Sequence, residues 1–232
     1  MSAAELVRRA TAELVGTAFL VAGVVGSGIA AQRLSPHDTG LQLLENSVAT
    51  GAALVALILA LQPVSASFNP VVTAVERALG RIDTVPAAVL VLAQLAGGIL
   101  GAVVANLMFD LDAVTVSTHQ RGDAGHLLGE VVATLGLVLV VFGALRSPRI
   151  ETVAFAVGGF ITAAYWFTSS TSFANPAVTV ARTLSDTIAG IAPSSVPGFL
   201  LAQVVGGAAG AALVVLLHPE PAVRPVPAEE PS

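Results

Sequence analysis

Residues 65–73 read Ser65-Ala66-Ser67-Phe68-Asn69-Pro70-Val71-Val72-Thr73, and residues 171–179 read Thr171-Ser172-Phe173-Ala174-Asn175-Pro176-Ala177-Val178-Thr179. Each Asn-Pro pair predicts the start of a helix, because Asn is a strong N-cap and Pro fits the first helical position, where its missing N–H would be unpaired anyway. Only short helix-compatible segments follow, Val71 to Leu79 and Ala177 to Leu184. A bilayer crossing needs roughly 20 apolar residues, so both segments are predicted to be half-helices.

The composition places these half-helices in an integral membrane protein. The chain has 232 residues, of which 55% are hydrophobic and only 11% charged, and its mean hydropathy is +0.85. A soluble domain has about 25% charged residues. The net charge of −5, without a basic patch, gives no indication of nucleic-acid binding. The absence of cysteine excludes disulfides, thiolate metal sites and a cysteine nucleophile.

Six apolar segments near bilayer length predict spanning helices. They are Ala12–Ala31, Leu43–Leu61, Ala87–Phe109, Leu127–Leu145, Thr152–Phe167 and Gly198–Leu217. Residues 1–11 carry two arginines, Arg8 and Arg9, and also resemble the start of a cleaved signal peptide, but the apolar run after them is long enough to favour a first spanning helix. Residues 110–126 predict a polar connector, and residues 218–232 a disordered tail rich in Pro and Glu.

The two halves of the chain, residues 12–109 and 127–217, repeat each other around the half-helices. The matching elements are Glu13-Leu14-Val15-Gly16-Thr17 with Glu130-Val131-Val132-Ala133-Thr134, and Ala93-Gln94-x-x-Gly97-Gly98 with Ala202-Gln203-x-x-Gly206-Gly207. Internal duplication of this kind is typical of transport folds. Because each half has an odd number of spans, the second half is predicted to lie in the membrane inverted relative to the first.

Arginine placement predicts a cytoplasmic N-terminus. In that orientation the cytoplasmic arginines are Arg8, Arg9, Arg77, Arg81, Arg146, Arg149 and Arg224, and the outer ones are Arg33, Arg121 and Arg182. The positive-inside rule favours this arrangement, which also places the C-terminus in the cytoplasm. The two half-helices then enter the membrane from opposite faces, and Asn69 and Asn175 approach each other at mid-depth.

Two helix N-termini that meet at mid-depth can select what passes between them. Each carries about half a positive elementary charge, so the pair repels cations and hydronium. The amides of Asn69 and Asn175 can donate N–H groups to the oxygen of a passing solute. One Asn-Pro pair alone also fits an ordinary helix start, but two pairs in matching repeats between apolar spans favour a pore.

The paired Asn-Pro motifs, the glutamate openings and the Gln-x-x-Gly-Gly spans resemble the aquaporin and aquaglyceroporin (major intrinsic protein) family from Ala12 to Leu217. The resemblance implies an all-α membrane protein, a right-handed bundle of six transmembrane helices and two re-entrant half-helices in two inverted repeats. It also implies one pore per subunit and a homotetramer in the lipid bilayer of the plasma (inner) membrane. Neither a cofactor nor a metal nor an enzymatic activity is expected.

Two residues depart from the family's pattern. Val71 stands where the family usually has Ala, at the back of the half-helix. Val178 stands directly after the second motif, where the family usually has an arginine that narrows the outer constriction; the next arginine, Arg182, lies one helical turn further on and is not expected to occupy that place. Gapless counting from the motifs gives the four predicted filter residues as Ala49, Ala163, Ser172 and Val178.

A filter without arginine lacks the fixed positive charge, the several N–H donors and the large side chain of that residue. We therefore expect a passive channel wide enough for glycerol, urea and undissociated metalloid acids such as arsenous acid, as well as water. The chain resembles bacterial family members with a similarly altered filter that are linked to arsenical permeation, methylated arsenicals included. Proton exclusion would rest on the half-helix dipoles.

Three alternatives compete with this reading. A strict water channel would need a narrower filter. An ion-coupled secondary transporter would need acidic or His residues along the spans near mid-depth, and apart from the terminal glutamates the spans have none. An intramembrane enzyme would need a nucleophile–base pair or a metal cluster, and neither the sequence nor the spacing of its four histidines provides one.

The buried polar residues of the spans have more than one possible role. The resemblance implies that Glu13 and Glu130 accept hydrogen bonds from the half-helix loops, with proton relay as the alternative. Gln94 and Gln203 could pair with loop backbone or hydrogen-bond between helices. Tyr165 is expected to be an interfacial anchor, with a place at the pore as the alternative.

Overall fold

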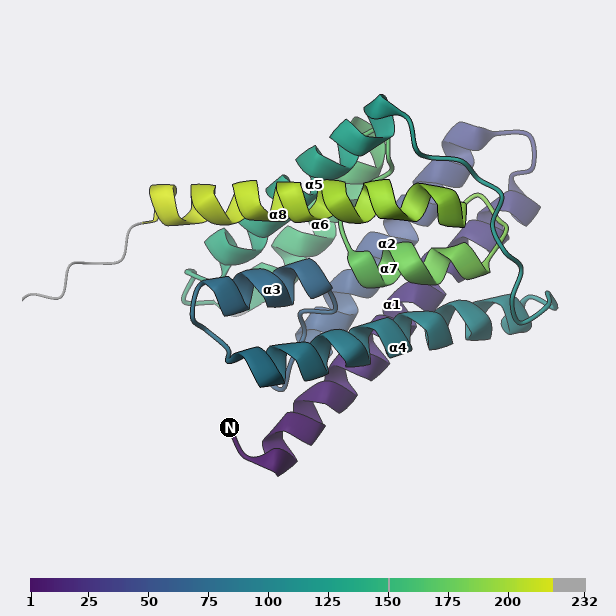
Figure 1. The fold of residues 1–232 in the computed structure, drawn as a ribbon. Coiled ribbons are helices and arrows are strands. Elements are labelled where there is room, and N and C mark those ends of the chain that lie inside the picture. Colours follow the sequence, from purple (N-terminus) through teal and green to yellow (C-terminus); the bar gives the residue numbers. More distant parts are fainter. Residues whose placement is uncertain (150, 219–232) are drawn as a thin grey trace, which may run out of the picture.

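The computed structural model of the protein describes residues 1–149 and 151–218, and the regular elements in these ranges are all helical. The helices form one elongated bundle (Figure 1). In chain order the elements are α1 (Ala3–Leu34), α2 (Thr39–Leu61), α3 (Pro70–Ala78), α4 (Thr84–Met108), α5 (Ala124–Ala144), α6 (Glu151–Phe167), α7 (Pro176–Ala181), the 3-10 turns η1 (Arg182–Leu184) and η2 (Pro193–Ser195), and α8 (Val196–Leu217). The predicted all-α class is confirmed.

Helices lie over all six predicted spans, but they differ in length. Five segments in the described part of the chain are long and apolar enough to cross a membrane: α1, α2, α4, α5 and the segment Pro193–Leu217, which includes α8. The remaining one, α6, has 17 residues. At about 1.5 Å per residue it measures roughly 26 Å, slightly less than the roughly 30 Å of a hydrocarbon core.

Several helices begin before the predicted spans, because their first turns are polar and therefore carry no apolar signal. α1 starts at Ala3 instead of Ala12, where Ser2 caps it by accepting the Glu5 N–H at 3.2 Å. In the same way Asp123 caps α5 through the N–H of His126 at 3.0 Å. The predicted tail beyond residue 218 lies outside the described residues.

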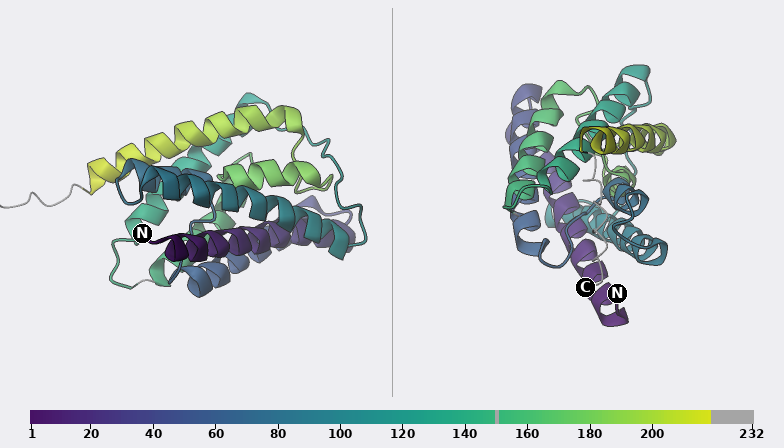
Figure 2. Two further views of the ribbon diagram at one scale, coloured as in Figure 1. Left: turned by 60° about the horizontal axis from the view of Figure 1, so that its bottom comes forward. Right: turned by 90° about the vertical axis from the view of Figure 1, so that its left-hand side faces the viewer.

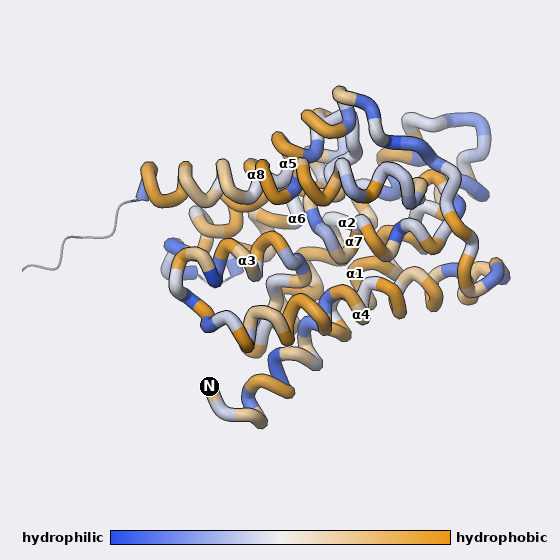
Figure 3. Tube along the Cα trace, in the orientation of Figure 1, coloured by the Kyte–Doolittle hydropathy of each residue, from blue (hydrophilic) through white to orange (hydrophobic). Residues whose placement is uncertain are grey.

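Large apolar side chains point outward from the bundle. Leu92 on α4 and Leu201 on α8 are each 66% exposed, and Leu216 is 72% exposed. Figure 3 shows mostly apolar residues along α4 and α8, and polar ones gathered in the connecting loops. Contiguous apolar surface of this kind needs lipid around it. The chain is a multi-pass membrane protein.

The long helices of each half pack in close pairs. Figure 2 shows the bundle from two further sides. α1 packs along α4, and α5 along α8. A Cβ on Gly97 would overlap the carbonyl of Leu14, and one on Gly206 would overlap that of Val131. The glycines of the repeat therefore allow the helix backbones to touch. This brings the glutamate span of each half directly against its Gln-Gly-Gly span.

Candidate pore

The Asn-Pro motifs start two half-helices, α3 and α7. The Asn69 Oδ1 accepts the Val71 N–H at 2.9 Å. The Asn175 Oδ1 accepts the N–H groups of Ala177 at 2.9 Å and Val178 at 3.3 Å. In both helices Pro occupies the first turn. The structure thus has N-capped helices at both motifs, although α7 gives way to η1 three residues before the predicted end of its segment.

The two caps bond to each other's loops. The Asn69 Nδ2 donates to the carbonyl of Ala174 at 2.8 Å, and the Asn175 Nδ2 donates to the carbonyl of Phe68 at 2.7 Å. The N-terminal ends of α3 and α7 therefore face each other at the centre of the bundle, with the two helices running outward in opposite directions (Figure 1). Each amide nitrogen carries two hydrogens, and among the described residues only one of them is donated.

The residue before each Asn has a left-handed backbone, at φ 46° in both Phe68 and Ala174. Neither is glycine, so each position stores strain of about 1–3 kcal/mol. The conformation directs the N–H of the residue toward a buried glutamate and its carbonyl toward the opposite Asn. The sequence offered no glycine to indicate these two turns.

Glu13 holds the first loop from inside the bundle. Its carboxylate is fully buried and accepts four hydrogen bonds. The donors are the Ser65 hydroxyl at 2.5 Å, the N–H groups of Ser67 at 2.9 Å and Phe68 at 2.7 Å, and the Gln94 amide at 2.7 Å.

Glu130 holds the second loop in the same way. It accepts the N–H groups of Phe173 at 2.8 Å and Ala174 at 2.9 Å, and the Gln203 amide at 2.6 Å. The two Gln side chains link further into the half-helices, because Gln94 also donates to the hydroxyl of Thr73 at 2.9 Å and Gln203 to that of Thr179 at 2.8 Å. Both glutamines thus donate from one helix to another, the second of the two roles expected for them, and their partners are side chains.

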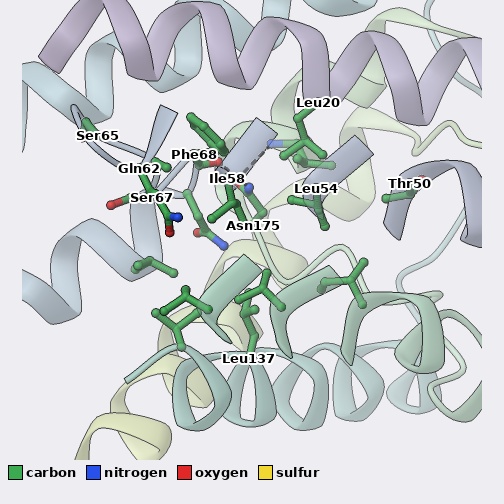
Figure 4. Close-up of a pocket in the computed structure, with 18 of the residues that line it drawn as sticks. Leu20, Thr50, Leu54, Ile58, Gln62, Ser65, Ser67, Phe68, Leu137 and Asn175 are labelled. Atoms are coloured by element: carbon green, nitrogen blue, oxygen red, sulfur yellow. Dashed lines mark hydrogen bonds between the residues drawn. The ribbon is translucent and has the colours of Figure 1, made fainter. Parts of the chain in front are cut away.

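One cavity of about 260 Å³ passes both Asn caps (Figure 4). One part of its lining is aliphatic and comes from the long helices, including Leu20, Leu54, Ile58 and Leu137. The other part comes from the loops that precede α3 and α7 and includes Phe68, Asn69, Ser172 and Asn175. The lining extends from Arg9, Gln62 and Glu76 at one end to Tyr165, Val178 and Arg182 at the other. We call the latter the connector end, because it lies on the side of the loop between α4 and α5.

Two of the four predicted filter residues line this cavity, and two do not. Ser172 and Val178 are on the lining. Ala49 is half-buried and Ala163 is exposed, and the lining at these levels comes from Thr50 and Tyr165 instead. A helix turns by about 100° per residue, so an error of one or two positions in a gapless count moves a side chain to another face.

Thr50 and Tyr165 bind each other across the two halves of the chain, with 3.2 Å between their oxygens. Tyr165 is only 3% exposed, so it lies at the cavity and not at the lipid surface. Its neighbour Trp166 is 51% exposed and donates to the Ser47 hydroxyl at 3.2 Å.

Arg182 reaches the connector end of the cavity although Val178 follows the second motif. The Arg182 side chain is 2% exposed and lies on the lining. Its Nε donates to the Ala189 carbonyl, and its Cζ lies 3.4 Å from the centroid of the Phe173 ring. The sequence analysis did not expect Arg182 at the outer constriction because it lies one helical turn beyond Val178, but a side chain of this length spans one helical turn.

Within residues 1–149 and 151–218, no three side chains of His, Asp or Glu gather closely enough to hold a metal ion. His119 and His126 pair with single aspartates, Asp186 and Asp123.

Comparisons with known proteins agree with this arrangement. The family model described as Major intrinsic protein matches residues 1–152. The chain is 46% identical over 224 residues to "Aquaglyceroporin AqpS" of Rhizobium meliloti (strain 1021), covering 96% of this chain and 94% of the relative. It is 28% identical over 220 residues to "Aquaporin NIP2-1" of Arabidopsis thaliana, covering 89% and 74%.

The fold has a solved counterpart. The structure of the aquaglyceroporin from Plasmodium falciparum matches with a TM-score of 0.68 at 18% identity, covering 91% of this chain and 95% of that one. Together with the two apposed Asn-Pro half-helices, these matches establish that the chain belongs to the major intrinsic protein family of aquaporin and aquaglyceroporin membrane channels, which are not enzymes.

Proposed function

We propose that the protein is a passive channel for small uncharged solutes wider than water, with the cavity as its path. The observation that carries the proposal is the course of this cavity, which runs past Asn69 and Asn175 and reaches Val178 at the connector end. The substrates are glycerol-like polyols and metalloid acids such as arsenous acid or its methylated forms, together with water.

The two-sided lining suits a polyol. The aliphatic side chains of Leu20, Leu54 and Ile58 can contact C–H groups, while the free N–H of each Asn amide can donate to a hydroxyl oxygen. A solute with an apolar side and a polar side loses little hydration energy on entry. An ion finds too few partners to replace its water, and the two helix N-termini repel a cation.

The width of the connector end favours these solutes over water alone. Valine at position 178 is smaller than arginine, and Thr50 and Ser172 are small as well. The name of the relative from Rhizobium meliloti, an aquaglyceroporin, supports the same assignment. The metalloid substrates rest on the filter residues and on the resemblance to arsenical-permeable bacterial members.

The membrane topology is part of the proposal. α6 is taken as a sixth crossing, so that residues 12–109 and 127–217 form inverted repeats around the connector 110–126. The distribution of arginines supports cytoplasmic termini in the plasma (inner) membrane, with the connector end outside. We further propose a homotetramer with one pore per subunit.

Light scattering from reconstituted vesicles tests the proposal with water, glycerol and arsenous acid in parallel. Val178→Arg should lower glycerol and arsenous acid flux about tenfold and water flux less, because the guanidinium adds bulk and donors to the connector end. Val178→Leu is the matched control, adding bulk without charge. An equal loss for all three solutes would contradict the wide filter.

The same vesicles separate the alternatives. A strict water channel would pass water and exclude both glycerol and arsenous acid. An ion-coupled transporter would saturate at low solute concentration or respond to an imposed proton gradient, whereas a passive channel does neither.

A further inference from the structure

Three consecutive backbone carbonyls near the connector end bind two guanidinium groups. The Arg121 side chain of the connector donates from Nε to the Gly190 carbonyl at 2.9 Å and from Nη2 to the Ile188 carbonyl at 3.0 Å. The Arg182 Nε donates to the carbonyl between them, that of Ala189. The segment 188–190 therefore holds both arginines in fixed positions.

The aromatic ring of Phe173 completes this arrangement. The Arg182 Cζ lies 3.4 Å from the ring centroid and the Arg121 Cζ 5.2 Å from it. Phe173 is itself held, because its N–H donates to Glu130 and its ring packs edge-on against Phe199 with 5.2 Å between centroids. Two cations thus share one rigid ring beside the loop of the second half-helix.

The two arginines differ in what they leave free. Arg121 uses all three of its nitrogens, with Nη1 at 3.5 Å from the Ser170 carbonyl, and it does not line the cavity. Arg182 lines the cavity and uses only Nε, so its two Nη groups bind nothing among the described residues. Neither Nη atom is one of the described side-chain atoms that are both fully buried and without a hydrogen-bond partner. Both are therefore accessible from the cavity that the Arg182 side chain lines.

We propose that Arg182 is the specificity-determining cation of this pore, presenting its Nη groups to solutes from one helical turn beyond Val178. The inference rests on the proposed function of the cavity as a pore. Val178 leaves the passage wide, while Arg182 places a full positive charge and free N–H donors beside it. The channel is then open to neutral solutes of glycerol size and closed to cations of the same size. The charge of Arg182 excludes these cations in addition to the half-helix dipoles.

The test uses urea and the guanidinium ion, which are nearly the same size and shape and differ by one charge. Flux of each is measured in proteoliposomes of wild type, Arg182→Met and Arg182→Lys. Arg182→Met should raise guanidinium flux about tenfold or more and change urea flux less than about threefold, because it removes a charge from a poorly screened passage. Arg182→Lys should keep guanidinium excluded.

Arg33→Met is the matched control. The Arg33 Nη2 donates to the Phe109 carbonyl at 2.5 Å and its Cζ lies 5.3 Å from that ring, but it is exposed and does not line the cavity. This variant should leave both fluxes unchanged. If Arg182→Met does not reach the membrane, Arg182→Gln replaces it, since its amide can still donate toward the Ala189 carbonyl.

The outcomes separate the two proposals. A wild type that passes neither urea nor glycerol contradicts the proposed function. If wild type passes urea and the Arg182→Met or Arg182→Gln variant still excludes guanidinium as well as wild type does, the role of Arg182 is overturned. The proposed channel function is not contradicted by that result. A wild type that passes guanidinium as readily as urea also overturns it.

Discussion

α3 and α7 are held alike at their caps and differently at their far ends. At each cap, a buried glutamate accepts two successive loop N–H groups. A glutamine donates both to that glutamate and to a threonine of the half-helix. The Asn side chain donates to a carbonyl of the opposite loop. Beyond the caps, α3 continues for nine residues and α7 for only six. After α3 the chain turns at Gly80, whereas after α7 it turns into η1.

Backbone hydrogen bonds join the far end of α7 to the connector. In the described residues no backbone hydrogen bond joins the far end of α3 to a separate loop, and the Arg81 Cζ just beyond it lies 5.2 Å from the centroid of the Phe142 ring. The N–H groups of Thr115 and Ser117 donate to the carbonyls of Leu184 and Thr183 at 3.0 and 2.9 Å. Arg182 lies at the start of this joined segment. The repeated network therefore positions the two caps, while the unrepeated segments determine which residues line each end of the cavity.

The largest effect is expected from the cap network itself. Glu13→Ala and Glu130→Ala each leave several buried donors without an acceptor, at about 1–3 kcal/mol per donor. Glu13 accepts four hydrogen bonds and Glu130 three, so the loss of thermal stability in detergent should be greater for Glu13→Ala. Glu5→Ala, on the exposed start of α1, is the control. Equal small losses at both sites would show that the network does not hold the caps.

The members of this network could be selected from the sequence because they are polar residues at matching positions in apolar spans, where such residues are rare, and the resemblance to the family implied the role of the glutamates. The sequence did not predict that Thr50 and Tyr165 face each other, because that contact depends on how α2 and α6 are rotated about their own axes. The rotation is set where Gly51 lies against Gly158, and a Cβ on Gly158 would come within 2.7 Å of the Gly51 carbonyl. No pattern within either helix specifies that contact.

Arg182 was missed for a related reason. Its position depends on the carbonyl of Ala189 and on the ring of Phe173, which come from separate loops that the sequence pattern does not bring together. The left-handed turns at Phe68 and Ala174 are likewise imposed by tertiary hydrogen bonds and have no local signal. Repeated polar side chains were predictable from the sequence, whereas backbone turns and single contacts that depend on tertiary packing were not.

An intermediate effect is expected where each half-helix packs on the opposite half. A Cβ on Gly207 would lie 2.5 Å from the Val71 Cγ1, whereas one on Gly98 would lie 3.1 Å from the Ala177 carbonyl. Gly207→Ala should therefore destabilise the protein by about 1–3 kcal/mol, and Gly98→Ala by less.

Val71→Ala restores the family's usual residue and provides the rescue. Combined with Gly207→Ala it should recover most of the lost thermal stability, because it removes the crowding methyl groups. Gly159→Ala, where a Cβ would meet nothing within 4 Å, is the control. Additive losses in the double variant would mean that Val71 does not crowd Gly207, and the two interfaces would then be alike.

The smallest effect is expected at the junction that only α7 has. The Asp186 carboxylate accepts the backbone N–H of Thr118 at 2.8 Å and its hydroxyl at 3.1 Å, with His119 nearby at 3.8 Å. The backbone hydrogen bond from Thr118 lowers the pKa of Asp186 below its ordinary value. Because the folded-state pKa is the lower one, the carboxylate stabilises the fold above its unfolded pKa of about 4, and this contribution is lost as the pH falls through the lowered value.

Asp186→Asn measures that contribution, since an amide can still accept a hydrogen bond but carries no charge. Asp186 is largely solvated, so the stability difference from wild type should be only a few tenths of a kcal/mol at pH 7 and should be smaller at about pH 3, because the contribution is lost as the pH falls through the lowered pKa. Thermal unfolding in detergent at both pH values checks this, with His119→Gln as the background that removes the neighbouring titrating group. A difference that is undiminished at about pH 3 would mean that the junction depends on shape and not on charge. The two half-helix regions would then differ only in how their loops are packed.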